Sequence, residues 1–281
     1  EKLEPLQHKT PICSRCATPI EFISSDAWYL KQLEFRDDLR KLANTMEFRP
    51  SRHRQLLLDW IDALTIDWPI SRRRYYHTEI PLWYCKGCGE VLAPPPGKYY
   101  RPWKDPAPFD ACPKCGGDAF AGEDRVFHTW MDSSCSNLLV TRYRSDPAFF
   151  AENFPASLRP QGREIVRTWL YYTTLKSWLV RNSKPFHTVF IHGLGLDAHG
   201  RAMHRTLGNV IDPWPYIDKH GADAIRFFAA TETNPGEDFR INVDKISGAG
   251  KFLTKLWNTA RFVSSFAEPE AGKLSPADEW I

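Results

Sequence analysis

Apolar residues recur at helical spacing in several separate stretches of this chain. Between residues 54 and 66 they follow one another at intervals of three or four, which places them on one face of a helix. The same periodicity runs through residues 160–180, 213–230 and 244–266. We therefore predict a helix in each of these stretches, and only a weak helical tendency over residues 26–43, where the apolar positions are loosely spaced.

Two shorter stretches have the features of strands. Residues 125–130 are strand-like, and residues 187–192 form a short run of β-branched and aromatic side chains followed by two glycines. A polar loop over residues 197–208 and further helices come next. The order strand, helix, strand, glycine-containing loop and helix is typical of a parallel sheet, so we predict the α/β fold class.

Composition identifies a globular chain and excludes several other classes. Of 281 residues, 42% are hydrophobic and 25% are charged, which excludes a disordered, collagen-like or coiled-coil chain. No stretch approaches the roughly 20 apolar residues of a membrane span, and there is no signal peptide, so we expect a cytoplasmic protein without a membrane partner. The net charge of +3 neither requires nor excludes nucleic acid. The basic run Arg72–Arg74 is either a contact for RNA phosphates or a solvated surface.

Four of the seven cysteines form two Cys-x-x-Cys pairs in a turn-rich stretch, residues 82–121. The pairs are Cys85 with Cys88 and Cys112 with Cys115, and a glycine follows each pair. Four thiolates on two tight turns complete the tetrahedral coordination that Zn²⁺ prefers. We predict a closed, structural zinc ribbon, with a disulfide pair or free thiols as the alternatives.

The remaining cysteines are less informative. Cys13 and Cys16 have the same spacing but supply only half the ligands of a zinc site. We expect a half-site that a segment outside this chain or a partner completes, or a site that stays empty. Cys135 has no paired cysteine, and we expect a packed thiol rather than a nucleophile.

Five blocks of sequence follow one another in an order that is characteristic of one family. They are WPISRRR (68–74), IPLWYCKGCGE (80–90), HTWMDSS (128–134), RPQGREIVRTW (159–169), and LGNVIDP (207–213) with GADAIRF (221–227). These blocks resemble class I aminoacyl-tRNA synthetases, and most of all valyl-tRNA synthetases of the archaeal type. Isoleucyl-tRNA synthetases share several of the blocks.

The resemblance implies the second half of a split Rossmann-type parallel sheet, with an inserted zinc ribbon and the start of an α-helical bundle. It assigns residues 1–81 to a connective segment that returns from a missing editing insertion, and residues 82–121 to the zinc ribbon. Residues 122–232 would be the second half of the catalytic domain. Residues 233–281 would be a stem-contact segment and the first helix of an anticodon-binding bundle. The N-terminal catalytic half, with its His-x-Gly-His signature, and the editing domain would be supplied in cis or in trans.

The resemblance also implies a chemistry: a ligase that activates valine with ATP and Mg²⁺ and then charges tRNA. The amino-acid pocket falls on Trp130, Asp132, Ile165 and Trp169. The ATP contacts fall on Glu164, His192, Gly193, Met203 and Arg205. The catalytic roles fall on His204 and Arg205, and the structural Zn²⁺ on Cys85, Cys88, Cys112 and Cys115, with Cys13 and Cys16 as the half-site.

One motif departs from the family. The mobile phosphate loop Lys-Met-Ser-Lys-Ser aligns with Ala202-Met203-His204-Arg205-Thr206, so the first lysine is lost and the second is an arginine. Removing one donor to a transition state typically costs about 3–4 kcal/mol. Arg205 still binds phosphate oxygens well, because a guanidinium offers a fork of donors. Help from His204 or Arg201 would offset the loss.

Three hypotheses follow. The first is a part of a valine–tRNA ligase that is incomplete as this chain alone. The second is a synthetase-derived paralog whose degenerate phosphate loop leaves a tRNA- or protein-binding module, or an isoleucyl-type fragment. The third is an unrelated zinc-ribbon α/β protein that binds nucleic acid. The first hypothesis is the preferred one. The lost lysine and the absent His-x-Gly-His signature support the second, whereas the ordered blocks weigh against the third.

Overall fold

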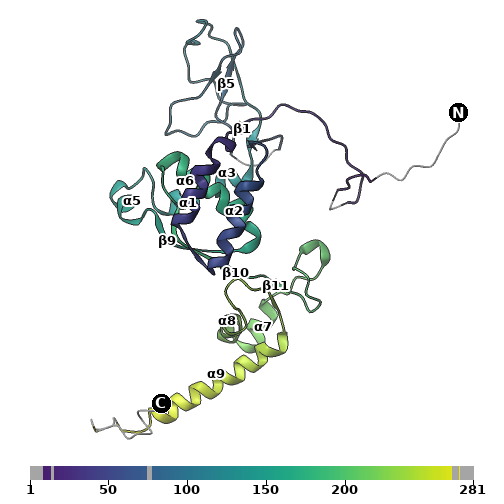
Figure 1. The fold of residues 1–281 in the computed structure, drawn as a ribbon, viewed down its shortest axis with the longest axis vertical. Helices are drawn as coiled ribbons and strands as arrows, with labels where there is room; N and C mark the ends of the chain where they lie inside the picture. Colours follow the sequence, from purple (N-terminus) through teal and green to yellow (C-terminus); the bar gives the residue numbers. More distant parts are fainter. Residues whose placement is uncertain (1–8, 14–15, 75–77, 268–271, 273–281) are drawn as a thin grey trace, which may run out of the picture. The chain divides into compact units, whose positions relative to one another are not determined.

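Residues 9–13, 16–74, 78–267 and 272 are described by a computed structural model, which divides the chain into two compact units. The first unit is Glu1–His192 and the second is Gly193–Ile281, and each is described by itself (Figure 1). The boundary falls inside the segment 122–232 that the resemblance assigns to one catalytic half. Within the described residues, no helix is both long and apolar enough to cross a lipid bilayer.

A three-stranded parallel sheet lies at the centre of the first unit. Strand β10 (Phe186–His192) lies between β2 (Glu47–Arg49) and β9 (Ala156–Gly162), and both neighbours run parallel to it. The register pairs His192 with Gly162, so β9 and β10 end at the same edge of the sheet. The parallel sheet confirms the predicted α/β class, and β10 confirms the predicted strand.

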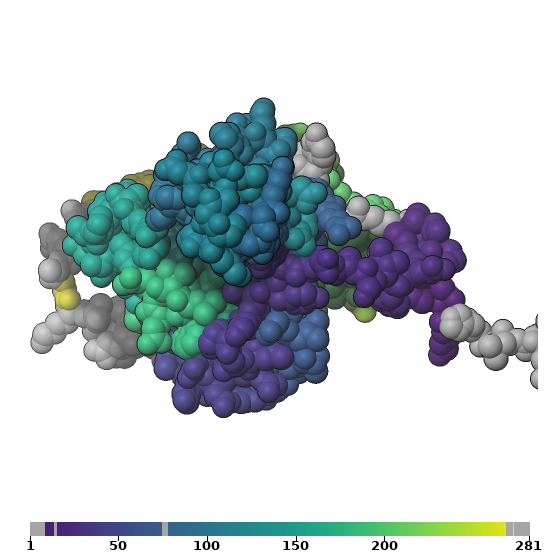
Figure 2. Space-filling model, turned by 90° about the horizontal axis from the view of Figure 1, so that it is seen from above, coloured from purple at the N-terminus to yellow at the C-terminus, as the bar shows by residue number. Residues whose placement is uncertain are grey.

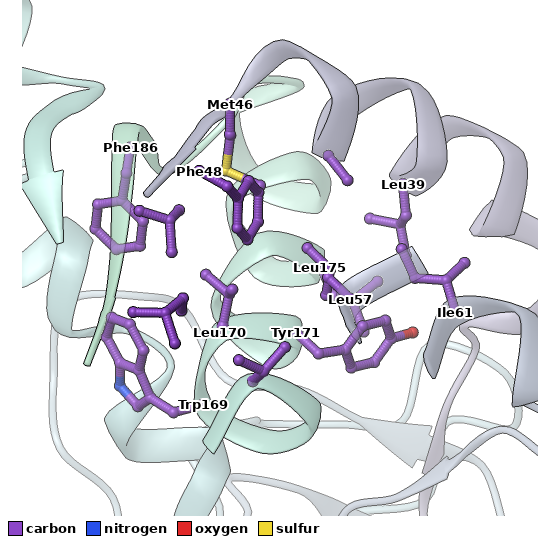
Figure 3. Packing of buried hydrophobic residues seen from close by; sticks show 14 of the residues in the cluster. Leu39, Met46, Phe48, Leu57, Ile61, Trp169, Leu170, Tyr171, Leu175 and Phe186 are labelled. Atoms are coloured by element: carbon purple, nitrogen blue, oxygen red, sulfur yellow. The ribbon is translucent and has the colours of Figure 1, made fainter. Parts of the chain in front are cut away.

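Three helices pack their apolar faces into one core (Figure 3). They are α1 (Arg36–Thr45), α2 (Arg54–Ala63) and α6 (Tyr171–Arg181), which connects β9 to β10. Leu39 of α1 and Ile61 of α2 are fully buried there. Burying one such side chain contributes about 1.5–3 kcal/mol. Helix α2 was predicted from its spacing, and α1 forms in the stretch where the spacing was weakest.

The helix predicted over residues 160–180 is wrong in its first part. Residues 160–162 belong to β9, and two irregular turns precede α6: η3 (Arg163–Ile165) and the π-helical turn η4 (Val166–Leu170). Pro160 has no N–H to donate to a neighbouring strand, and β9 tolerates it because β9 lies at the edge of the described sheet.

The strand predicted over residues 125–130 is shorter than expected. Strand β8 (Val126–Phe127) ends early because His128 caps a helix, α3 (Thr129–Ser133), by accepting the N–H of Trp130 on its Nδ1 at 3.3 Å. The other elements of the first unit outside the ribbon are β1 (Tyr29–Leu30), η1 (Leu33–Phe35), η2 (Ser51–His53), β3 (Trp68–Pro69), β4 (Ser71–Arg72), α4 (Ser136–Val140) and α5 (Pro147–Asn153).

The cysteine-rich stretch forms a small antiparallel sheet of its own. Strand β5 (Trp83–Cys85) lies between β6 (Val91–Leu92) and β7 (Phe120–Gly122). Trp83 is buried and meets the rings of Tyr100 and Phe109 edge to face, with centroids 5.7 and 6.0 Å away. Figure 2 views this module from above as a continuous blue surface. A few aromatic rings are its only sizeable apolar packing among the described residues, as expected of a ribbon that depends on a metal.

One buried acid joins the ribbon to the connective segment. Glu123, only 2% exposed, accepts hydrogen bonds from Arg125, from the hydroxyl of Tyr84 in β5, and from the indole N–H of Trp28 at 2.8 Å. Burial raises the pKa of Glu123, but these donors outweigh it and hold the pKa well below its usual range. The carboxylate therefore stays charged and fixes Trp28 against the ribbon.

The second unit contains the predicted C-terminal helices. They are α7 (Trp214–His220), α8 (Ala222–Thr231) and α9 (Val243–Val263), and Gly221, at a φ of +85°, separates the first two. A short parallel pair, β11 (Gly195–Leu196) and β12 (Phe239–Arg240), and a single turn, η5 (Arg205–Leu207), complete it. A separate small core joins α8 to α9. Both predicted helical stretches are thus confirmed, with the first one divided in two.

Candidate functional site

The four ribbon cysteines lie together in the structure. Their Sγ atoms are all within 4.8 Å of one another, with Cys85 3.5 Å from Cys115 and Cys88 3.6 Å from Cys112. Four sulfurs around one Zn²⁺ at 2.3 Å would be about 3.8 Å apart. The cluster therefore fits the predicted closed zinc site.

Each ribbon pair is held by the same backbone turn, and the Cys13 pair repeats it. In all three, the first cysteine donates its N–H to the carbonyl five residues later and accepts the N–H four residues later, at 2.7–2.9 Å. The residue at the fourth position has a left-handed backbone in each turn: Ala17, Gly89 and Gly116, with φ of 58°, 74° and 75°. Cys13 and Cys16 thus lie on a formed knuckle, although the residues between them lie outside the described ones. The metal-ligand cluster found in the described residues contains neither of them.

The predicted amino-acid pocket residues of the first unit meet at one core. Trp169 belongs to the main core and is 5% exposed, whereas Trp130 of α3 and Ile165 of η3 are half-buried and pack against that core. The indole N–H of Trp169 donates to the carbonyl of Ser133 at 2.9 Å, which ties η4 to the end of α3. Asp132 is exposed on α3. The structure thus brings the three apolar pocket residues to one place.

Trp169 is held on its faces as well as at its N–H. Phe186 of β10 stacks on it with ring centroids 5.7 Å apart, as Figure 3 shows. The guanidinium of Arg159 in β9 lies 3.8 Å from the ring centroid. Burial lowers the pKa of Arg159, and its Nε has no hydrogen-bond partner among the described residues. A cation over an indole contributes about 0.5–2 kcal/mol, more when water is excluded. These contacts fix the orientation of the indole.

The polar candidates of the first unit lie at the carboxyl edge of the sheet. Glu164 follows β9, and His192 ends β10 beside Gly162. Glu164 lines a surface hollow of about 390 Å³ with Leu56 and Val166, and neither Trp130 nor Trp169 lines it. Glu164 is exposed, shares η3 with the pocket residue Ile165, and has its carboxylate against Gly162 at the end of β9.

A close backbone contact explains why residue 193 is a glycine. A Cβ added there would lie 1.7 Å from the carbonyl oxygen of Glu237, so the backbone at this position passes directly against another segment of the second unit. The predicted close approach of a nucleotide is thus not needed to explain this glycine. The adenine-side role of His192 and Gly193 stays a prediction.

The predicted phosphate loop lies in the second unit and is an ordered structure built around Asp197. This carboxylate is 6% exposed and accepts four hydrogen bonds at 2.8–2.9 Å: from the N–H of His199, from the N–H and Nε of Arg201, and from the amide of Asn209. These bonds, led by the one from Asn209, hold the pKa of Asp197 well below its usual range. A single aspartate thus fixes both ends of the loop.

Asn209 completes the frame. Its amide also donates to the carbonyl of Ala202 at 3.1 Å, and its Oδ1 accepts the N–H of His204 at 2.8 Å. Met203 is partly buried, and its sulfur accepts the N–H of Ile211 at 3.4 Å. The backbone of the altered motif is therefore held in place by two polar side chains outside the motif.

The loop cations differ in their partners. His204 is exposed, and its Nδ1 lies 2.7 Å from the hydroxyl of Thr206, so this nitrogen caps η5. Arg201 pairs with Asp197. The side chain of Arg205 is exposed and makes no hydrogen bond or ion pair within the part of the chain that the structure describes, while its backbone carbonyl accepts the N–H of Gly208 at 3.2 Å. Arg205 is thus available to an anion, as predicted, while His204 serves the turn. Whether Arg205 faces the same cleft as Trp130 and His192 stays a prediction, because they belong to the other unit.

Sequence reasoning missed two framing residues and one contact. Asp197 and Arg159 looked like ordinary polar positions, and only their partners in space reveal their roles. Cys135 is half-buried, and the ammonium of Lys176 lies 3.0 Å from its sulfur. Cys135 is outside the main core, so the predicted packed thiol is better described as a thiol beside a lysine.

Comparisons with known proteins agree with this geometry. Residues 19–242 match the model of the family described as tRNA synthetases class I (I, L, M and V). The valine–tRNA ligase of Aeropyrum pernix is 50% identical over 99% of this chain and 34% of its own length. The valine–tRNA ligase of Nanoarchaeum equitans is 47% identical over the whole chain and 37% of its own length. The chain thus spans about a third of the length of these relatives.

Solved structures share the fold. The methionyl-tRNA synthetase of Mycobacterium tuberculosis in complex with methionyl-adenylate superposes with a TM-score of 0.66 at 20% identity, covering 96% of this chain and 48% of that one. The LeuRS of a ternary complex with tRNA and LeuAMS from Agrobacterium radiobacter K84 gives 0.57 at 24% identity, covering 69% and 27%. The family match over residues 19–242 shows that the chain belongs to the class I aminoacyl-tRNA synthetases of the I, L, M and V group.

Proposed function

We propose that this chain is the second catalytic half of a cytoplasmic valine–tRNA ligase, which activates valine with ATP and charges tRNA. The observation that carries the proposal is the identity of 46–50% to three archaeal valine–tRNA ligases over essentially the whole chain. The ribbon cluster supports it as well, since the four predicted cysteines lie within 4.8 Å of one another.

In this proposal the carboxylate of valine attacks the α-phosphorus of ATP and pyrophosphate leaves. The protein forms no covalent bond in this step, so catalysis consists of alignment and of positive charge around the phosphates. Arg205 would donate to the leaving phosphates from the second unit. Glu164, His192 and Gly193 would bind the nucleotide, and Mg²⁺ would neutralise phosphate charge.

Valine would be recognised by shape. Trp130, Ile165 and Trp169 would form the wall against its branched side chain, with Asp132 near its ammonium group. Because Arg159 and Phe186 hold Trp169, the wall cannot easily yield to a larger substrate. A pocket of this kind discriminates one methylene by about 1–3 kcal/mol, which is a modest selectivity. This limit is consistent with an editing domain elsewhere in a longer protein.

The open edge of β9 supports the proposal of a second half. Among the described strands, β9 pairs only with β10, so its other side has no neighbour. A strand from an N-terminal half, in cis or in trans, would pair there and complete the sheet. We propose the segment boundaries 1–81, 82–121, 122–232 and 233–281 on the basis of the sequence resemblance.

Zinc would have a structural role. Cys85, Cys88, Cys112 and Cys115 would hold one Zn²⁺ in the ribbon. The knuckle at Cys13 would contribute two further thiolates to a second site, with the other ligands supplied by a segment outside this chain. Its backbone turn, which matches the ribbon turns bond for bond, supports this half-site.

The test is ATP–pyrophosphate exchange by the full-length protein that carries this chain. Exchange that depends on valine, with charging of tRNA(Val), supports the proposal. Loss of exchange in a protein with intact zinc would instead support a paralog with a degenerate phosphate loop. Faster exchange with isoleucine than with valine would support the isoleucyl alternative.

A further inference from the structure

The altered phosphate loop lacks a lysine, and the structure shows two arginines beside the gap. Ala202 has no polar side chain, and its backbone is fixed by Asn209 and by a β-bridge to Leu196. No other residue can therefore move into its place by a shift of register. Any replacement charge has to come from a side chain that already lies next to the turn formed by residues 197–201.

Arg201 is the first such side chain. Of its donors, only Nε and the backbone N–H are bonded among the described residues, and both donate to the carboxylate of Asp197, at 2.9 and 2.8 Å. Among the described residues its two terminal NH₂ groups have no acceptor, and the side chain is 55% exposed. Asp197 thus orients the guanidinium from behind and leaves its outer donors free. Two parallel N–H groups on one side of a guanidinium match the spacing of phosphate oxygens.

Arg240 of β12 is the second. Its guanidinium lies against the turn at Gly200, where an added Cβ would be 3.2 Å from Nη2 and 3.3 Å from Nε. Gly200 also has a φ of +79°, which favours glycine. Arg240 is exposed and has no carboxylate partner among the described residues. The turn formed by residues 197–201 therefore ends with the guanidinium of Arg201, and the guanidinium of Arg240 packs against its Gly200.

We propose that Arg201 and Arg240 bind phosphate oxygens of the nucleotide and supply the positive charge that Ala202 does not. This inference rests on the proposed function of the loop. Arg205 and these two side chains then surround the phosphates from three positions of the same unit. The two arginines are catalytic residues in this proposal, and Asp197 is a positioning residue for Arg201.

An isolated surface ion pair would look similar at first sight. Such a pair between Arg201 and Asp197 would contribute little to stability, and Asp197 would need no other partner. Here the carboxylate is buried and already accepts three other N–H groups, so the arginine is not needed to satisfy it. The ion pair with Asp197 instead fixes the orientation of the Arg201 guanidinium. Binding of a phosphate depends on that orientation.

The experiment measures inorganic tripolyphosphate binding to the 281-residue chain by calorimetry at fixed low salt. We expect Arg201→Met and Arg240→Met each to weaken binding about tenfold or more, since a hydrogen bond to a charged group is worth about 1.5–3 kcal/mol. Arg201→Lys should recover part of the loss through its charge, and Asp197→Asn should weaken binding while leaving all three arginines present. Circular dichroism confirms that each variant folds.

Arg226→Met is the matched control, because Arg226 is an exposed arginine of the same unit that pairs with Asp223 on α8. It should bind tripolyphosphate as the parent chain does. Binding by Arg201→Met and Arg240→Met at the parent affinity overturns the inference, and so does an equal loss in Arg226→Met, which would indicate charge alone.

Pyrophosphate exchange by the full-length protein separates this inference from the proposed function. Valine-dependent exchange that is unchanged in Arg201→Met and Arg240→Met would overturn the inference and leave the function standing. Arginine-dependent tripolyphosphate binding without exchange for any amino acid would overturn the function and leave the phosphate contacts standing.

Discussion

The cysteine knuckles and the proposed phosphate loop hold their backbone turns in different ways. Both must hold a tight turn of backbone near the surface. In the knuckles the functional residues are themselves part of the turn, and the cysteine pattern is complete in the ribbon. In the loop the turn is held by Asp197 and Asn209, which lie outside the motif. A frame outside the motif lets the motif residues change, which explains how Ala202 can replace a lysine without loss of the fold.

The largest effect should come from the ribbon, because its cysteines both form the turns and are the predicted zinc ligands. We expect Cys112→Ser to abolish zinc binding and to unfold the ribbon, because a structural zinc contributes about 10–16 kcal/mol in small metal-dependent modules. Metal analysis and near-ultraviolet circular dichroism of the buried Trp83 measure both. Cys135→Ser, outside the cluster, is the control and should keep its zinc. A Cys112→Ser chain with full zinc content would disprove the ribbon assignment.

The next effect concerns Arg205, whose side chain has a proposed role in catalysis but does not hold the backbone of the loop. Arg205→Ala should slow adenylate formation by the full-length enzyme about 10²–10³-fold, the cost of removing one transition-state donor. The KM for valine should stay within about twofold, because in the proposed function Arg205 binds phosphate oxygens and not valine. Single-turnover kinetics and a valine titration measure the two quantities. Equal losses in both would indicate that Arg205 holds the loop.

A smaller effect tests whether Arg159 holds Trp169 of the proposed valine pocket in place, as Asp197 holds the loop. Arg159→Met should raise the KM for valine several-fold, since the contact of Arg159 with the Trp169 indole is worth about 0.5–2 kcal/mol. The KM for ATP should not change. Arg181→Met is a fair control, because Arg181 also lies over an aromatic ring, that of Phe150 at 5.2 Å, but away from Trp169. A matching rise in that variant would indicate general loosening.

The smallest effect concerns acid. The pKa of Asp197 is below its ordinary value of 3.8, so the folded loop binds this proton less readily than the unfolded chain. Its contribution to stability is therefore fully present above pH 3.8 and is lost only as the pH falls through the lower, folded value. We expect the amides of His199 and Arg201 to stay protected from hydrogen exchange at pH 4. In Asn209→Ala, which loses the first of the donors, protection should decrease at a higher pH than in the parent.

The sequence predicted those parts of the molecule that depend on neighbours along the chain. Cysteine spacing was sufficient for the ribbon, because a knuckle is closed by bonds across four and five residues. The boundary of α6 was not predictable in this way, because a π-helical turn shifts the phase of the apolar residues around Trp169 while leaving them apolar.

Contacts between residues that are distant in the chain could not be predicted, because sequence patterns report only on neighbours along the chain. Asp197 and Asn209 are ordinary loop residues until the turn brings them to 2.9 Å. Arg159 reads as one more charged residue, and its contact with Trp169 requires that β9, not a helix, precede η3. The roles of Asp197, Asn209 and Arg159 therefore became visible only with the fold.

The unpaired side of β9 has a practical consequence for handling this chain. A free strand edge offers backbone donors and acceptors to any other strand, including the same edge of a second molecule. Pro160 removes one donor near the middle of that edge and so discourages such a match, without blocking it. Concentrated solutions of the isolated chain should scatter light through edge-to-edge association, and adding the N-terminal half should dissolve these aggregates by occupying the edge first.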